Sequence, residues 1–293
     1  MGQYSIKDLE LLSGIKAHTI RIWEKRYRVI TPDRTDTNIR TYCDEDLKKL
    51  LNIALLNNNG HKISKISKLK YKDLCAEVEK IGITESSYDT YIDRLILSMV
   101  DLDRASFEML VKEATDKMGF EGTCIHVLYP FLQKIGVMWM ANSINPAQEH
   151  FISSLIIQKM YAATDKLYTP EVKKKKAIFF LREGELHEMG LLFYRYLMTK
   201  RHVDAIYLGQ SVPLVDLKQT VEAHKPQYLV TALVATLHED VLDTYLHSLS
   251  NSFPNQKIIV SGYQISQFKR PIPKNIIKVD DVHQYIDYID NQL

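Results

Sequence analysis

Ala177-Ile178-Phe179-Phe180-Leu181 is followed after three residues by Glu185-Leu186-His187-Glu188-Met189-Gly190. A short apolar run of this kind is typical of a strand that is buried on both faces of a sheet. A histidine just beyond such a strand can present a ring nitrogen at the carboxyl edge of the sheet, where open α/β sheets bind ligands. The stretch therefore predicts a parallel sheet with a ligand site at His187.

The residues from 177 to 293 alternate between strand-like and helix-like patterns. We predict strands at residues 177–181, 205–208, 228–234, 257–260 and 276–279. We predict helices at residues 189–200, 214–224, 238–251, 264–268 and 282–292. Alternation with short connections is typical of a parallel, doubly wound sheet. Residues 177–293 are therefore predicted to form a flavodoxin-like α/β domain.

Several polar or small residues follow these predicted strands and should meet at one edge of the sheet. Glu185 can accept a ring N–H of His187 and so orient the imidazole. The hydroxyl of Thr231 can donate or accept a hydrogen bond. Gly190 lacks a Cβ and permits close approach of its backbone to a ligand.

The pattern Glu-x-His-x-x-Gly at 185–190 resembles the Asp-x-His-x-x-Gly signature of cobalamin-binding domains of the methionine-synthase and methylmalonyl-mutase type. Thr231-Ala232-Leu233 stands at their Ser-x-Leu position and Ser261-Gly262 at their Gly-Gly position. The resemblance implies that His187 is the lower axial ligand of cobalt. It implies further cofactor contacts from Glu185, Gly190, Thr231, Leu233, Ser261 and Gly262. The Cβ that serine adds at position 261 could crowd the buried tail of the cofactor.

Charge is distributed unevenly along the 293 residues. Residues 1–72 hold 15 Lys and Arg against 8 Asp and Glu, a net of +7, whereas residues 73–293 hold 23 against 28, a net of −5. A basic head on an acidic body indicates that the head binds a polyanion.

The basic head has the pattern of a winged helix-turn-helix. Apolar residues at helical spacing predict helices at 4–13 and 17–27, with a break at Ser13-Gly14. The second helix should present a polar and basic face to a major groove, formed by His18, Thr19, Arg21, Lys25 and Arg26. Residues 29–42 are rich in turn formers, and we predict a β-wing whose Arg34 and Arg40 reach phosphates or the minor groove.

The order of these pieces resembles the MerR family of winged-helix transcription regulators over residues 3–70. The resemblance is carried by Tyr4-Ser5-Ile6, Ser13-Gly14-Ile15, Thr19-Ile20-Arg21, Trp23-Glu24, Arg34-Thr35, Arg40, Tyr42 and Asp46-Leu47. The run from Ile22 to Tyr27 is most similar to the cobalamin-dependent, light-responsive branch. The resemblance implies a double-stranded DNA operator as partner and adds Tyr42 to the DNA-binding residues.

Residues 73–168 have helical patterns at 88–100, 105–117, 123–138 and 146–168, which predict a four-helix bundle. Trp139 is followed after nine residues by Glu149-His150. Considered without the rest of the chain, a core tryptophan and a helix-capping glutamate explain these residues.

With the downstream signature, Trp139, Glu149 and His150 resemble the helical cap of light-responsive MerR regulators, which lines the upper face of cobalamin. An indole can stack on an adenosyl group, and a carboxylate can accept hydrogen bonds from a ribose. Photoreceptor members have a histidine directly after the tryptophan, where this chain has Met140. The resemblance therefore implies cofactor binding more strongly than a light response.

Composition sets the remaining expectations. Hydrophobic residues make up 45% and charged residues 25%, as in soluble proteins, and no run approaches the roughly 18 apolar residues of a membrane span. The three cysteines form no Cys-x-x-Cys pair, which favours a reduced, cytoplasmic setting. The N-terminus has no basic-then-apolar pattern of a signal peptide. No Ser-His-Asp set, phosphate loop or zinc spacing offers independent chemistry, so we expect a non-enzymatic protein.

We therefore predict a cytoplasmic regulator with domains at residues 1–72, 73–168 and 177–293. Its cofactor would be adenosylcobalamin, and its role that of a repressor acting as a homo-oligomer, a dimer or tetramer. Two alternatives stay open. The last domain could have lost its cofactor and serve protein–protein contacts, or the chain could be a corrinoid carrier of a methyltransferase.

Overall fold

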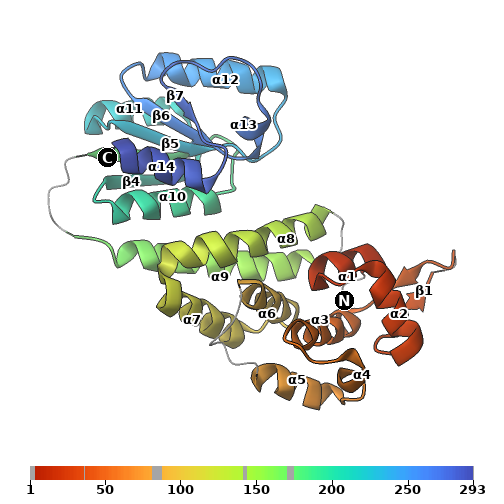
Figure 1. Ribbon diagram of the computed structural model, residues 1–293. Helices are drawn as coiled ribbons and strands as arrows, with labels where there is room; N and C mark the ends of the chain where they lie inside the picture. Colours follow the sequence, from red (N-terminus) through yellow and green to blue (C-terminus); the bar gives the residue numbers. More distant parts are fainter. Residues whose placement is uncertain (1–3, 36, 81–87, 141–143, 170–174, 293) are drawn as a thin grey trace. The chain divides into compact units, whose positions relative to one another are not determined.

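The computed structural model describes residues 4–35, 37–80, 88–140, 144–169 and 175–292, except for the side chains of Glu79 and residues 137–140. The chain divides into two compact units, residues 1–156 and 157–293 (Figure 1). The division falls inside one helix. No helix in the described part of the chain has the length and apolar character of a membrane span.

The first unit begins with the two helices of a helix-turn-helix. α1 (Ile6–Ser13) starts at Ser5, whose side chain accepts the N–H of Asp8, while the Asp8 carboxylate accepts the N–H of Ser5. It ends at Gly14, where φ is +70°, a value that favours glycine. α2 (Ala17–Tyr27) follows with the predicted bounds.

The predicted wing is confirmed as a short antiparallel pair. β1 (Asp33–Arg34) pairs with β2 (Arg40–Thr41). The first helix was predicted to begin at Tyr4, which is wrong, because the backbone of Tyr4 forms an isolated β-bridge with Tyr42. The strand-like extension thus ties the start of the chain to the end of the wing.

Three helices follow the wing, namely α3 (Asp44–Asn58), α4 (Ile63–Ile66) and α5 (Tyr71–Lys80). The predictions missed α5, which packs against α3 and buries Leu74 and Val78. The predicted boundary between residues 1–72 and 73–168 falls within the first turn of α5. That division stays a prediction.

The helical region after α5 contains α6 (Tyr88–Val100), α7 (Arg104–Thr123), the π-helical turn η2 (Cys124–Leu128), α8 (Tyr129–Met140) and α9 (Pro146–Asp165). A single helix was predicted at residues 123–138. The structure has two segments there, the π-helical turn η2 and the helix α8. Gly119, with φ of +72°, interrupts the helical backbone of α7 close to the predicted end at residue 117.

The second unit is a five-stranded parallel sheet with helices on both faces (Figure 1). Its strands are β3 (Lys176–Arg182), β4 (Asp204–Val212), β5 (Tyr228–Ala232), β6 (Lys257–Ser261) and β7 (Ile276–Lys278). Its helices are α10 (Met189–Lys200), α11 (Leu214–His224), α12 (Glu239–Ser252), α13 (Tyr263–Gln267) and α14 (Val282–Gln292).

All five predicted strands and five predicted helices of this unit are present. The largest difference is β4, which continues to Val212 rather than ending at Leu208, with irregular pairing to β3 on either side of Phe180. The strand order is β4-β3-β5-β6-β7, so the connection reverses direction between β3 and β5. Ligand sites of doubly wound sheets lie at this switch point, at the carboxyl ends of the strands.

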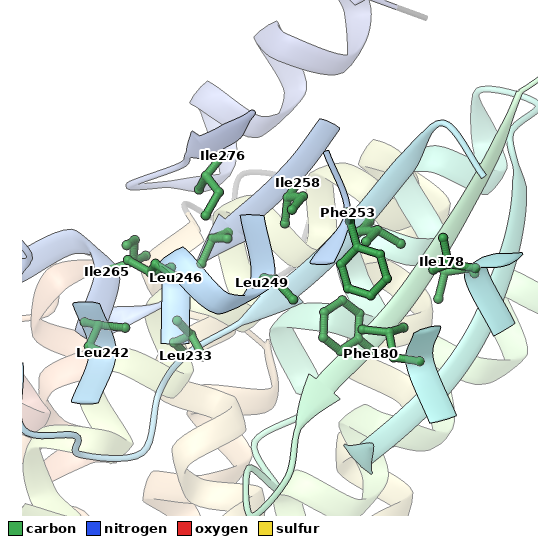
Figure 2. Close-up of a cluster of buried hydrophobic side chains, with 14 of the residues drawn as sticks. Ile178, Phe180, Leu233, Leu242, Leu246, Leu249, Phe253, Ile258, Ile265 and Ile276 are labelled. Carbon is green, nitrogen blue, oxygen red and sulfur yellow. The ribbon is translucent and has the colours of Figure 1, made fainter. Parts of the chain in front are cut away.

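Alternate residues of the strands form the core. Ile178 and Phe180 of β3 pack with Ile258 of β6 and with Leu246 and Leu249 of α12 (Figure 2). Successive strand residues point to opposite faces, so Phe179 lies on the other face, where α10 packs against β3. A sheet covered on both faces explains why β3 is a continuous apolar run.

Candidate functional site

The loop between β3 and α10 is organised by the carboxylate of Glu185. This side chain is fully buried and accepts four backbone N–H groups. The two neighbours within the loop donate to Oε1, Leu186 at 3.0 Å and His187 at 3.1 Å. The loop after β5 donates to Oε2, Val234 at 2.9 Å and Ala235 at 2.7 Å. Glu185 thus joins the two strands that flank the switch point.

The same carboxylate fixes the imidazole of His187. Oε1 of Glu185 lies 2.5 Å from Nδ1 of His187. Burial raises the pKa of Glu185, but the N–H of Ala235, the His187 ring and the N–H groups of Val234 and His187 outweigh it and lower the pKa to about 2. An ionised acceptor at Nδ1 selects the imidazole tautomer with its proton on that nitrogen.

The other ring nitrogen of His187 is available. The side chain is 61% exposed, and no residue in the described ranges bonds to Nε2. A neutral imidazole with a held Nδ1–H and an exposed Nε2 lone pair has the form of a metal ligand.

A second feature of the same edge is an unsatisfied hydroxyl in β5. Thr231 is fully buried, and its Oγ1 has no partner in the described part of the structure. Buried hydroxyls almost always find a partner, so an orphan marks a place where a bound group can supply one. Ser261 is buried beside it, and its hydroxyl donates to the Thr231 carbonyl oxygen at 3.4 Å.

The end of β6 closes tightly on the backbone after β5. Gly262 has φ of +102°, and a Cβ there would lie 2.5 Å from the Leu233 carbonyl oxygen. Position 262 therefore admits only glycine. The side chain of Leu233 belongs to the hydrophobic core beside Leu242, so only its backbone lies at this edge (Figure 2). Gly190 lies in the first turn of α10.

Glu188 forms a cluster with two tyrosines that was not predicted from the sequence. Its Oε2 accepts the hydroxyl of Tyr207 at 2.5 Å and that of Tyr161 at 3.4 Å. Burial and the Glu188 carboxylate together raise the pKa of Tyr207 well above its usual range. Glu188 was part of the quoted stretch, but nothing in the sequence indicated its partners 19 and 27 residues away.

The predicted cap residues lie at the ends of two helices. Trp139 and Met140 are in the last turn of α8, and their side chains fall outside the described residues. Glu149 is in the first turn of α9, where it accepts the Ser153 hydroxyl at 2.5 Å. His150 is exposed, with Nδ1 2.8 Å from Glu149 Oε2.

Four of the predicted DNA-binding residues, Arg21, Lys25, Arg34 and Arg40, line one concave surface of the first unit. His18, Arg21, Lys25 and Arg26 of α2 are exposed, and Thr19 is half-buried. The concave surface encloses a volume of about 680 Å³. Arg21 and Lys25 of α2 and Arg34 and Arg40 of the wing line it. It also includes Arg28, the residue that ends α2, which was not among the predicted DNA-binding residues.

Glu24 joins α2 to the wing beside this surface. Its carboxylate lies 3.3 Å from Arg40 Nε and accepts the Tyr42 hydroxyl at 3.4 Å. Tyr42 is buried, and burial together with the Glu24 charge raises its pKa to about 12. The structure thus places the Tyr42 hydroxyl on Glu24, at the junction of α2 and the wing.

Comparisons with known families match two stretches of the chain. Residues 4–72 match the MerR HTH family of regulatory proteins, and residues 91–164 match a B12 binding domain. The chain combines a MerR-type DNA-binding domain with a B12-binding domain. The second match lies on α6 to α9, ahead of the sheet that carries His187.

Relatives of this MerR-type chain span most of its length. It is 27% identical over 257 residues to the HTH-type transcriptional repressor CarH of Myxococcus xanthus, covering 86% of this chain and 85% of that protein. It is 24% identical over 260 residues to the repressor CarA of the same organism, covering 88% and 85%. These relatives are named as repressors, in keeping with the predicted non-enzymatic role.

A solved structure supports the fold. The monomethylamine corrinoid protein of Methanosarcina barkeri aligns with a TM-score of 0.53 at 16% identity, covering 71% of this chain and all of that one. Together with the family matches, this confirms the predicted fold class: a winged helix-turn-helix head, helices, and a doubly wound α/β sheet.

Proposed function

We propose that this chain is a cytoplasmic transcriptional repressor whose binding to double-stranded DNA is controlled by adenosylcobalamin. The MerR-type and B12-binding matches support a cobalamin-responsive regulator. The domains are residues 1–72 as head, 73–168 as cap and 177–293 as cofactor-binding sheet. The adenosyl form, the repressor role and a dimer or tetramer are further parts of the proposal.

One observation carries the cofactor assignment: His187 has its Nδ1 held by a buried, ionised carboxylate and its Nε2 exposed. Thr231 offers a buried hydroxyl that lacks a partner among the described residues, and Gly262 keeps the neighbouring backbone free of a Cβ. When bound, adenosylcobalamin supplies a cobalt ion that accepts a nitrogen ligand and a cobalt–carbon bond that light can break.

The other proposed site residues have separate roles in cofactor binding and DNA binding. Glu185 orients and polarises the imidazole. The motif formed by Trp139, Glu149 and His150 supports a role for these residues in covering the cofactor, which the indole and the carboxylate would hold by stacking and hydrogen bonding. In the head, Arg21, Lys25, Arg26, Arg34 and Arg40 supply cations for phosphates and bases, with His18 and Thr19 on the same helix.

Oligomer size then sets DNA affinity. Each additional head bound to the same DNA makes the next contact intramolecular, so a small change in assembly produces a large change in occupancy. A cofactor that fixes the assembly therefore controls repression.

The experiment that tests this proposal measures whether the protein retains the corrin. The full chain is mixed with adenosylcobalamin in the dark, freed of unbound cofactor, and its visible spectrum is recorded. The wild type and His238→Ala, which removes an exposed histidine of the same unit, should retain corrin in equal amounts. His187→Ala should lose it or show the spectrum of cobalt without a histidine ligand. No retention by the wild type refutes the proposal and favours a regulator that acts only through protein contacts.

A second measurement addresses DNA and light. A duplex selected from a random library by the cofactor-loaded protein serves as operator, and light scattering reports the assembly. Removal of the cofactor should weaken binding and reduce the oligomer. Green light should do the same if the cobalt–carbon bond is the switch, whereas an unchanged complex identifies a sensor of cofactor supply instead.

A further inference from the structure

Helix α9 belongs to both units of the chain. It runs from Pro146 to Asp165, and the division between units falls after Ile156. Its first turn carries Glu149, and Tyr161 lies twelve residues later. At 1.5 Å per residue these positions are about 18 Å apart along one continuous helix. A displacement of Tyr161 is therefore a displacement of the helix that carries Glu149.

Tyr161 contacts the residue next to His187. Its hydroxyl donates to Oε2 of Glu188 at 3.4 Å, and its ring meets that of Tyr207 edge to face, with centroids 6.2 Å apart. All three residues lie in the second unit. The end of α9 is thus hydrogen-bonded to the His187 loop at the Glu188 carboxylate.

The two bonds to Glu188 differ in strength. The Tyr207 bond is 2.5 Å long, and Tyr207 lies within the sheet under the Arg195 guanidinium, 5.1 Å from the ring centre. The Tyr161 bond is 3.4 Å long, at the limit of hydrogen bonding, and Tyr161 is 40% exposed. The shorter bond to Tyr207 is therefore the stronger of the two, and the bond to Tyr161 is the one that a small displacement would break.

We propose that Glu188 and Tyr161 form a latch through which the His187 loop controls the position of α9. The latch deepens the proposed function and rests on it, because the loop is the one assigned to the cofactor. The Cα atoms of residues 187 and 188 are joined by one peptide unit of about 3.8 Å. A shift of the His187 backbone by a few tenths of an ångström moves Glu188 by a comparable amount, which shortens or breaks a bond of 3.4 Å.

The contact is tested first without cofactor, by hydrogen exchange of the full chain followed by mass spectrometry. Tyr161→Phe removes only the hydroxyl, so the amides of residues 157–165 should exchange about fivefold faster, as expected for loss of one hydrogen bond. Tyr168→Phe is the matched control, because Tyr168 lies beyond α9 and is 73% exposed. Equal exchange in Tyr161→Phe and the wild type overturns the latch.

The coupling is tested by loosening the loop. Glu185→Gln places an amide where four N–H groups now converge, so it should raise exchange at 157–165 about fivefold in the wild-type background and less than twofold in Tyr161→Phe. Equal effects in both backgrounds overturn the proposal. If Glu185→Gln does not fold, Gln210→Ala loosens the same loop by removing the N–H donated to the Leu186 carbonyl oxygen at 2.9 Å.

The effect of a bound corrin on the latch is tested by hydrogen exchange with added aquocobalamin. Its addition should change exchange at 157–165 in the wild type and leave Tyr161→Phe largely unchanged, while both bind the corrin by visible absorbance. An equal change in both overturns the latch. Failure of the wild type to bind corrin refutes the proposed function, and the cofactor-free arms then decide the latch alone.

Discussion

Replacing Glu24 by glutamine should weaken DNA binding although it removes a negative charge from a DNA-binding surface. The carboxylate lies 3.3 Å from Arg40 Nε and accepts the Tyr42 hydroxyl at 3.4 Å, so it fixes the wing relative to α2. Glutamine keeps the shape of the side chain and loses the charge that holds Arg40.

Two effects of opposite sign decide the outcome. A unit charge at about 10 Å from a phosphate in water contributes roughly 0.4 kcal/mol, so its removal alone would tighten binding about twofold. Hydrogen bonds to charged groups contribute about 1.5–3 kcal/mol, which partial exposure reduces to roughly 1–2 kcal/mol here. Loss of wing positioning is the larger effect, and we expect binding to weaken about fivefold to tenfold.

Fluorescence anisotropy with a labelled operator duplex over a salt series measures both effects. If Arg40 stops contacting its phosphate, the slope of log K against log salt should fall in magnitude by about 0.9. Asp33→Asn removes the same charge from β1, where Asp33 is exposed, and should leave binding unchanged or about twofold tighter. Tighter binding by Glu24→Gln with an unchanged salt slope would refute the positioning role.

Three further predictions concern the two units. Thr231→Val removes a buried hydroxyl that has no partner among the described residues, so the cofactor-free protein should become more stable by about 1 kcal/mol in urea unfolding while it retains less corrin. Gly262→Ala places a Cβ 2.5 Å from the Leu233 carbonyl oxygen at a φ of +102°, and should lower stability by at least about 2 kcal/mol, read as a fall in Tm; an unchanged Tm would contradict that geometry. Burial raises the pKa of Asp93 from 3.8 to about 6 against the opposing charge of Lys134. The folded state therefore binds this proton more tightly, so the contribution of Asp93 to stability is present below pH 4 and is lost as pH rises through 6, by at most about 3 kcal/mol; Asp93→Asn should remove that pH dependence from urea titrations.

Much of the local structure was determined by the sequence. The bounds of α2, α6, α10, α11 and α14 agree with the predictions, because apolar spacing and helix-ending residues act within a few positions of one another. The sheet followed from the alternation of apolar runs and helix patterns. The order of the strands in the sheet, with β3 between β4 and β5, does not follow from the pattern of any one strand and is a property of the doubly wound fold class.

The candidate site was predictable as a set of residues at one edge, but not as a network. Glu185 was expected to hold His187, and the structure places its carboxylate at Nδ1. The N–H groups of Val234 and Ala235, which bury and ionise that carboxylate, lie 49 and 50 residues away, and only strand order brings them to it.

The same reason explains what the sequence could not assign. Leu233 faces the core rather than the edge, and the Tyr42 hydroxyl meets Glu24, because each orientation depends on what packs against it. Tyr161, on a helix predicted only as a bundle element, reaches Glu188 through tertiary packing. Residue spacing fixes periodicity and caps within one element, whereas contacts between elements are set by topology and side-chain packing, which no local pattern contains.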